Sequence, residues 1–250
     1  MTEFKDYFSE HSNNYAAFRP HYPSELAQVL AQLSPSTQFA LDCGCGTGQL
    51  SVLLAECFDH VVATDASQAQ IVQAEPKENI QYQVALAEQS GLTAQSVDLI
   101  TVAQAAHWLD LPTFYNEVKR IAKPQAIVAL ITYGVLHLDQ PEIDALLQHF
   151  YHQDIFQYWP PERKHVENGY TDFEFPFQEI VFPKVTMFEE WNFFELIGYL
   201  NTWSAVKVAT QHLGHNPVEF FANQLAKEWG NLEQKRKVHW PLSGRIGRVI

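Results

Sequence analysis

Apolar positions follow two alternating periods along residues 39–133 of this 250-residue chain. Short apolar runs of strand length occupy 39–42, 61–65, 80–85, 97–103 and 126–132. Helical spacing of apolar positions appears in 24–33, in 49–58, from Ser67 to near Pro76, and in 114–122. Apolar strands that alternate with helices predict right-handed βαβ units and a parallel sheet covered on both faces.

The pattern changes after residue 133. We expect a helix and an irregular, aromatic-rich stretch over 139–178, a strand over 179–187, helices over 190–213 and 217–229, and strand-like segments over 238–250 that Ser243-Gly244 interrupts. No repeat or flexible linker separates the two halves, so we predict one domain over 1–250. Its parts are an N-terminal arm and helix (1–38), a cofactor-binding core (39–133), cap insertions with a late strand (134–235), and terminal strand segments (236–250).

A glycine-rich turn between the first strand and the next helix gives the strongest chemical signal. Its sequence is Leu41-Asp42-Cys43-Gly44-Cys45-Gly46-Thr47-Gly48. Closely spaced glycines let the backbone approach a ligand, and the following helix presents free N–H groups beside it. A dinucleotide-binding turn has Gly-x-Gly-x-x-Gly spacing, which disfavours an NAD enzyme here. The carboxylate of Asp42 would repel a pyrophosphate but favour an ammonium group, so the turn suits the methionine end of S-adenosylmethionine.

A second acid supports the same interpretation. Asp65 ends the second strand, 23 residues after Asp42. An acid at this strand tip can accept hydrogen bonds from both ribose hydroxyls, and Ala66 beside it is a further candidate cofactor contact. NAD-binding proteins carry an acid at a similar position. Asp65 therefore distinguishes S-adenosylmethionine from NAD only when it is considered together with the glycine spacing.

Two more loops follow the third and fourth strands, at the edge where open α/β sheets place their sites. Ala87 is expected to meet the adenine through its backbone amide, whereas Glu88 is equally compatible with a solvated loop acid. Gln104 is a candidate cofactor contact. His107 and Trp108 are expected to flank the sulfonium and the acceptor; the alternative is that they cap the core below the site.

Composition narrows the possible partners. The formal net charge of −13 disfavours binding to nucleic acid. The chain has three cysteines, two of them in the glycine turn, which argues against a disulfide framework and favours a reducing compartment. These two cysteines alone would make a poor zinc site, so we expect no metal. The first residues lack an apolar signal core, and the longest strand-like apolar run is too short for a membrane span. We therefore expect a soluble cytoplasmic protein without a membrane partner, either a monomer or a weak homodimer.

These motifs resemble those of the class I S-adenosylmethionine-dependent methyltransferases of the type 11-like kind. Three further segments resemble the trans-aconitate and cantharidin-resistance methyltransferase group: Phe18-Arg19-Pro20-His21-Tyr22-Pro23, residues 103–110, and Tyr199-Leu200-Asn201-Thr202-Trp203-Ser204. The resemblance implies a Rossmann-like, doubly wound α/β fold with seven strands, the last antiparallel, and a helical, aromatic-rich cap in the C-terminal half. It also implies S-adenosyl-L-methionine as cofactor and S-adenosyl-L-homocysteine as product. Leu86 departs from the pattern, because many relatives carry there an acid that binds the adenine amino group.

The resemblance favours O-methylation of a small carboxylate, which needs no general base. Arg19 is the candidate cationic clamp for that carboxylate, although it is equally compatible with pinning the arm to the core. Tyr22, His107 and Trp108 are candidate acceptor contacts, and His107 would act as base for a phenol, alcohol or amine. A phenol, amine, protein or tRNA acceptor, and a non-catalytic S-adenosylmethionine-binding protein, remain the alternatives. We also expect the aromatic N-terminal arm to fold over the cofactor as a lid.

Overall fold

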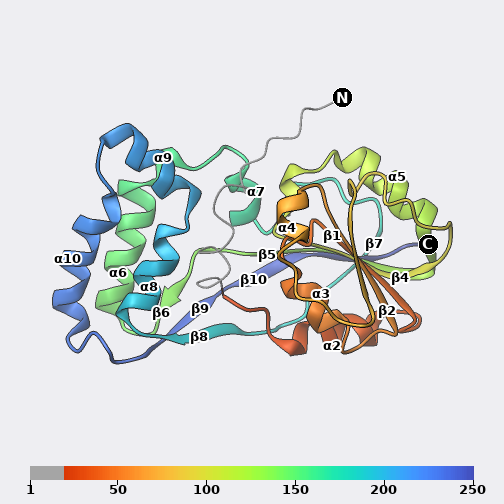
Figure 1. Ribbon diagram of the computed structural model, residues 1–250, viewed down its shortest axis with the longest axis horizontal. Helices are drawn as coiled ribbons and strands as arrows, with labels where there is room; N and C mark the ends of the chain where they lie inside the picture. The colour runs from red at the N-terminus through yellow and green to blue at the C-terminus, as the bar shows by residue number, and fades with distance from the viewer. Residues whose placement is uncertain (1–19) are drawn as a thin grey trace.

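The computed structural model describes residues 20–250, and a seven-stranded sheet forms its centre (Figure 1). The strands are β1 (Phe39–Cys43), β2 (His60–Asp65), β3 (Ile80–Val84), β4 (Val97–Ala103), β5 (Ala122–Tyr133), β7 (Gln178–Ile180) and β10 (Leu242–Arg248). Their order is β3-β2-β1-β4-β5-β10-β7, and β10 runs antiparallel to both of its neighbours. The predicted doubly wound sheet with an antiparallel last strand is confirmed.

Side chains alternate along the central strands into two cores, one on each face of the sheet. One core joins the strands to α2 (Ser24–Leu33) and α3 (Gln49–Leu54), and it includes Leu26, Leu30, Ala40, Leu50, Val61 and Leu99. The other joins them to α5 (Leu111–Ile121), and it includes Leu41, Val62, Ile100, Phe114 and Val118. Figure 1 shows α2 and α3 on one side of the sheet and α5 on the other. Because both faces are covered, the loops at the strand ends are where a ligand can reach the sheet.

A helical cap stands beside the sheet (Figure 1, left). It contains α6 (Pro141–His149), α8 (Phe193–Asn201), α9 (Ser204–Leu213), α10 (Pro217–Trp229) and an antiparallel sheet of order β6-β9-β8, formed by His137–Leu138, Arg236–Trp240 and Met187–Trp191. The short helix α7 (Arg163–Glu167) lies between the cap and the sheet. Apolar cap residues belong to the same cluster as the core under α2 and α3. No helix within residues 20–250 has the length and apolar character needed to cross a bilayer.

The core helices after β1 and β2 are shorter than the pattern predicts. The helix α3 ends at Leu54, because the amides of Cys57 and Phe58 both donate to the Leu54 carbonyl and close a turn there. The helix α4 spans only Gln68–Ile71. The segments that follow both helices are turns, so the loops leading to β2 and β3 are longer than expected.

Two predictions for residues 179–213 are wrong. The single strand expected over 179–187 is two strands in different sheets, β7 and β8. Pro183, which has no N–H to donate to a strand ladder, lies between them. The single helix expected over 190–213 is two helices, because the amide and hydroxyl of Thr202 both donate to the Tyr199 carbonyl and end α8.

The terminal strands also separate at a different residue. The break between β9 and β10 falls at Pro241, whereas β10 continues through Ser243-Gly244, which the sequence suggested as the interruption. Gly244 pairs with Ile131 of β5 and has a φ of +150°. A Cβ there would overlap the carbonyl oxygen of Leu130. Glycine at this position therefore permits close pairing of β10 with β5.

We expect Gly244→Ala to lower the free energy of unfolding by roughly 2–4 kcal/mol, since the added methyl group combines backbone strain with overlap. Gly214→Ala is the matched control: Gly214 has a φ of +76° but open space around its Cα. The control should lose only about 1 kcal/mol from its left-handed backbone. Denaturant unfolding measures both, and equal losses would show that the Leu130 carbonyl is not the constraint.

Candidate active site

The three glycines of the turn after β1 all have left-handed backbones, with φ values of 63°, 56° and 86° at Gly44, Gly46 and Gly48. Two of them make room for the protein itself. A Cβ on Gly44 would lie 2.6 Å from the Ala105 Cβ, and one on Gly48 would overlap the Tyr82 hydroxyl. At Gly46 the nearest heavy atom would be 3.8 Å away, so the turn is open at its centre. Gly46 is therefore the position at which a ligand can approach the backbone.

Asp65 ties this turn to the end of β2. Its carboxylate accepts a hydrogen bond from the Gly46 amide at 2.9 Å and another from the Ser67 amide at 2.8 Å. The half-buried Ala66 lies between these anchors. A carboxylate has about four acceptor positions, so Asp65 can hold the turn and still accept ribose hydroxyls.

Asp42 is buried at the carboxyl end of β1, with 1% of its surface exposed. Its two oxygens accept hydrogen bonds from the Ser51 hydroxyl at 2.6 Å and the Thr101 hydroxyl at 2.7 Å. Burial raises the pKa of Asp42 to about 6, although these two hydrogen bonds act in the opposite direction. Because the carboxylate is shielded from solvent, it would act on a ligand at the turn by electrostatic attraction over a short distance. Direct contact with an ammonium group stays a prediction.

The loop after β3 braces the start of α5. Glu88 accepts a hydrogen bond from the Asp110 amide at 2.8 Å, so part of its capacity is used within the protein. Ala87 is buried, whereas Leu86 is 52% exposed. Leu86 stands at the position where many relatives carry an acid, so this loop offers an exposed apolar side chain on which a planar ring such as adenine can pack.

Gln104 is held in an unusual backbone conformation at the end of β4, with a φ of 56°. Its amide donates to the Ile131 carbonyl, its side-chain nitrogen donates to the Tyr133 carbonyl, and its side-chain oxygen accepts from the Thr132 hydroxyl. The side chain is thus bonded at both ends to β5. A cofactor contact by Gln104 stays a prediction.

His107 and Trp108 lie together on a short 3-10 turn, Ala106–Trp108, with ring centroids 4.7 Å apart. The His107 Nδ1 is 3.1 Å from the Tyr170 hydroxyl. Burial, together with smaller contributions from the charges of Arg163 and His165, lowers the pKa of His107 to about 3. The imidazole is therefore neutral at physiological pH.

Sequence reasoning missed four residues of the segment between β6 and β7. Tyr170 contacts His107 and Arg163 lies within electrostatic reach of it, whereas Tyr151 and Trp159 pack around Arg163. Tyr170 is fully buried with a φ of 60°, and Tyr151 packs 5.6 Å from Trp159 between ring centroids. The aromatic richness of residues 139–178 was the available signal, but it did not indicate which rings face the site. Only the folded cap brings these residues to the end of β4.

The structure describes only some of the N-terminal residues for which we made predictions. Tyr22 is buried and packs edge-on against Tyr133 at 6.0 Å between ring centroids. Arg19 and the proposed lid over residues 1–18 lie outside the described residues. The roles of Arg19 and Tyr22 in acceptor binding stay predictions.

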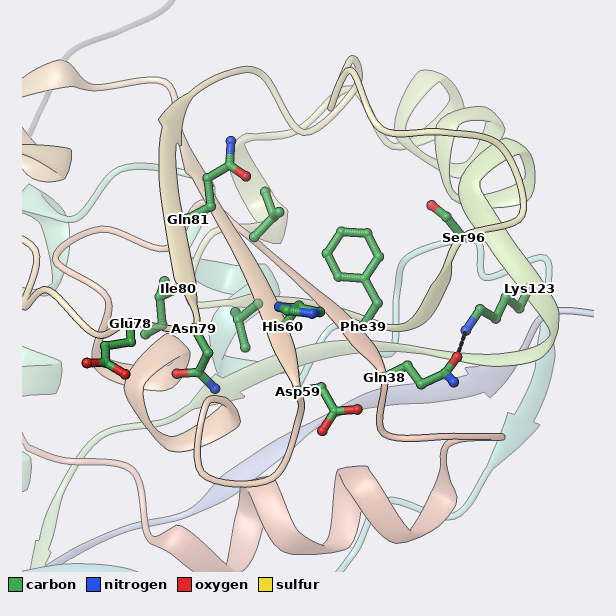
Figure 2. A pocket seen from close by; sticks show the side chains of 12 residues that line it. Gln38, Phe39, Asp59, His60, Glu78, Asn79, Ile80, Gln81, Ser96 and Lys123 are labelled. Carbon is green, nitrogen blue, oxygen red and sulfur yellow. Dashed lines mark hydrogen bonds between the residues drawn. The ribbon is translucent and has the colours of Figure 1, made fainter.

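A separate hollow lies at the opposite edge of the sheet (Figure 2). Phe39, His60 and Ile80, the first residues of β1, β2 and β3, line it together with Gln38 and Lys123. The Lys123 ammonium donates to the Gln38 side-chain oxygen at 3.0 Å (Figure 2). This hollow lies at the amino ends of the strands and shares no residue with the glycine turn.

Comparisons with known proteins identify the family. Residues 41–130 match a family model described as a methyltransferase domain. A candidate methyltransferase of Dictyostelium discoideum is 35% identical over 206 residues, which are 81% of this chain and 78% of that protein. A probable S-adenosylmethionine-dependent methyltransferase of Saccharomyces cerevisiae is 30% identical over 138 residues, 52% of this chain and 46% of the yeast protein. The chain belongs to the class I S-adenosylmethionine-dependent methyltransferases.

The likeness extends to the cap. The solved structure of a candidate type II methyltransferase from Anaeromyxobacter dehalogenans matches this methyltransferase with a TM-score of 0.89 and 44% identity. The match covers 93% of this chain and 99% of that one. The cap helices and their small sheet are therefore shared with that protein, together with the cofactor-binding core.

We expect the charge of Asp42 to lower the stability of the free methyltransferase and to strengthen cofactor binding. Its pKa rises from 3.8 to about 6 on folding, so the folded state binds the proton more tightly. Stability therefore falls as the pH rises from about 4 to about 6, and above that the buried charge costs up to about 3 kcal/mol. We expect Asp42→Asn to raise the melting temperature at neutral pH, to leave it unchanged near pH 4, and to weaken binding of S-adenosylhomocysteine.

Thermal unfolding at both pH values and calorimetric titration of S-adenosylhomocysteine measure these effects. Ser51→Ala is the matched control, because it removes one hydrogen bond from Asp42 but keeps the charge. An Asp42→Asn protein that binds S-adenosylhomocysteine as tightly as the wild type would contradict the functional role of this carboxylate.

Proposed function

We propose that this methyltransferase transfers a methyl group to a carboxylate oxygen of a small-molecule acceptor and leaves a methyl ester. The observation that carries the proposal is the environment of His107: its Nδ1 lies 3.1 Å from the Tyr170 hydroxyl, and burial, with smaller contributions from Arg163 and His165, lowers its pKa to about 3. An effective general base has a pKa near the working pH. The predicted base is thus too weak to deprotonate a phenol, alcohol or ammonium group, whereas a carboxylate is already ionised and needs no base.

The proposed cofactor site consists of the loops at the carboxyl ends of β1 to β4. When bound, S-adenosylmethionine supplies a methyl group made electrophilic by its positively charged sulfur. The open backbone at Gly46 lets the ligand approach, Asp65 offers acceptor positions for the ribose, and Asp42 supplies negative charge near the amino-acid end. Leu86 provides an apolar surface for the adenine in place of an acid.

The residues of the short turn after β4 would position the acceptor. His107, which Tyr170 holds in place, forms an aromatic wall together with Trp108. Burial lowers the pKa of His107 and raises the pKa of Tyr170, so both side chains are neutral at neutral pH. Such a wall excludes water and aligns the acceptor oxygen with the methyl carbon. In the transfer the new O–C bond forms as the S–C bond breaks, the bonding pair stays on sulfur, and no proton leaves.

The finer assignments rest on sequence likeness and charge. Residues 18–23, 103–110 and 199–204 resemble the trans-aconitate and cantharidin-resistance group, whose members methylate carboxylates. The net charge of −13 supports a small acceptor rather than a nucleic acid. We also propose a cytoplasmic location and a monomer or weak homodimer.

The direct test is transfer of labelled methyl groups from S-adenosylmethionine to a panel of di- and tricarboxylates, fatty acids, phenols and amines, with bulk tRNA and protein included. The proposal predicts label in one or more carboxylates, released by mild base as expected for a methyl ester. Label in a phenol, an amine, tRNA or protein, with every acid inert, would overturn it. No label in any acceptor despite tight S-adenosylhomocysteine binding would favour the non-catalytic alternative.

The pH dependence follows from the His107 pKa. Since this pKa lies near 3, the imidazole stays neutral at higher pH. We expect kcat/KM for the carboxylate acceptor, measured at saturating S-adenosylmethionine, to be flat between about pH 7 and 9, above the pKa of Asp42. We expect His107→Ala to lower it less than about tenfold, because no base is lost. A rise of kcat/KM with pH, or a loss of about 10² to 10⁴-fold in His107→Ala, would show base catalysis instead.

A further inference from the structure

Arg163 is held rigidly at the start of α7. Its Nε donates to the Tyr151 hydroxyl at 2.9 Å, and its guanidinium carbon lies 4.7 Å from the ring centroid of Trp159. Tyr151 is itself fully buried and bonded to Glu167. A planar cation that is stacked on an indole and bonded at one edge has little freedom left to lose when it binds a ligand.

The opposite edge of this guanidinium has no partner within residues 20–250. Its Nε is 3.9 Å from a Glu167 oxygen that already accepts from Tyr151, and neither terminal amino group makes a hydrogen bond in the described part of the chain. The indole nitrogen of Trp159 is also buried without a hydrogen-bond partner among the described residues. The side chain of Arg163 remains 20% exposed, so a ligand can reach it. Three donor groups, two amino groups and one indole N–H, are thus left unused on two stacked side chains.

This place adjoins the predicted acceptor position. The helix α7 packs against β5 and against the turn that carries His107 and Trp108. Figure 1 shows α7 between the cap and the sheet. The charge of Arg163 also contributes to the lowered pKa of His107, which places the guanidinium within electrostatic reach of that ring.

We propose that Arg163 is a specificity-determining residue that binds a carboxylate of the acceptor through its two free amino groups. This rests on the proposed carboxylate acceptor. A guanidinium fork matches the two oxygens of a carboxylate, which a lysine or a neutral donor cannot do. Arg163 therefore selects anionic acceptors from its position on α7.

Binding to the protein loaded with S-adenosylhomocysteine tests this assignment. The probes are succinate, citrate, benzoate and octanoate, each titrated calorimetrically beside its neutral amide. We expect the wild type to bind at least one carboxylate about tenfold or more better than its amide, and Arg163→Gln to lose that preference. Arg163→Lys, which keeps the charge without the fork, should keep only part of it.

Arg236→Gln is the matched control. Arg236 also lies over an indole, 5.1 Å from the Trp229 ring centroid, but on β9 of the cap sheet. It should bind the carboxylates as the wild type does, and all variants should bind S-adenosylhomocysteine equally, which confirms that they are folded. A wild type that binds no carboxylate better than its amide, or an Arg163→Gln protein with wild-type preference, would overturn the proposal.

Labelled methyl transfer separates failure of this assignment from failure of the proposed function. If Arg163→Gln methylates carboxylates with the wild-type KM, the carboxylate acceptor stands and the role of Arg163 falls. If only phenols or amines are labelled, both fall. A raised KM for carboxylates with little change in kcat is the result expected of a residue that binds the acceptor equally in the ground state and the transition state.

Discussion

The buried carboxylate of Asp42 is the constraint around which the cofactor end of this methyltransferase is arranged. Ser51 of α3 and Thr101 of β4 both donate to it, so the charge fixes a helix and a neighbouring strand to the end of β1. Asp65 then holds the glycine turn to the end of β2. The free protein would be more stable with a neutral residue at position 42, because burial disfavours the charged form. A destabilising charge beside an open turn is the arrangement expected where a cationic ligand supplies the missing compensation.

The sequence allowed the cofactor half to be predicted because local signals there agree with tertiary structure. Apolar strand runs, amphipathic helices and the spacing of Gly44, Gly46 and Gly48 each depend on a few neighbouring residues. The cap, the last strand and the tertiary contacts of the site could not be predicted to the same depth. Thr202 ends a helix through a bond to Tyr199, and Gly244 permits strand pairing where the pattern suggested a break. The partners of Gln104 on β5, the clustering of Tyr151, Trp159 and Arg163, and the contact of Tyr170 with His107 depend on contacts between distant segments.

The acceptor side of the site differs in character from the cofactor side. Around His107 the groups are aromatic and neutral, and the one predicted base is held far below its usual pKa by burial. Arg163 supplies positive charge at the same place, anchored by Tyr151 and Trp159. On the proposed function, such a site would bind a negative acceptor and would need no base. The proposal therefore pairs the negative charge of Asp42 at the cofactor end with the positive charge of Arg163 on α7 at the acceptor end.

Proton release during turnover tests this account most directly. The measurement uses the acceptor that the methyl-transfer panel identifies, in weakly buffered solution near neutral pH with an indicator dye, and compares protons released with methyl groups transferred. A carboxylate acceptor loses no proton when it becomes an ester, so the account predicts no proton release beyond background. Release of one proton for each methyl group transferred would show that a phenol, alcohol or amine is the acceptor and would contradict the account.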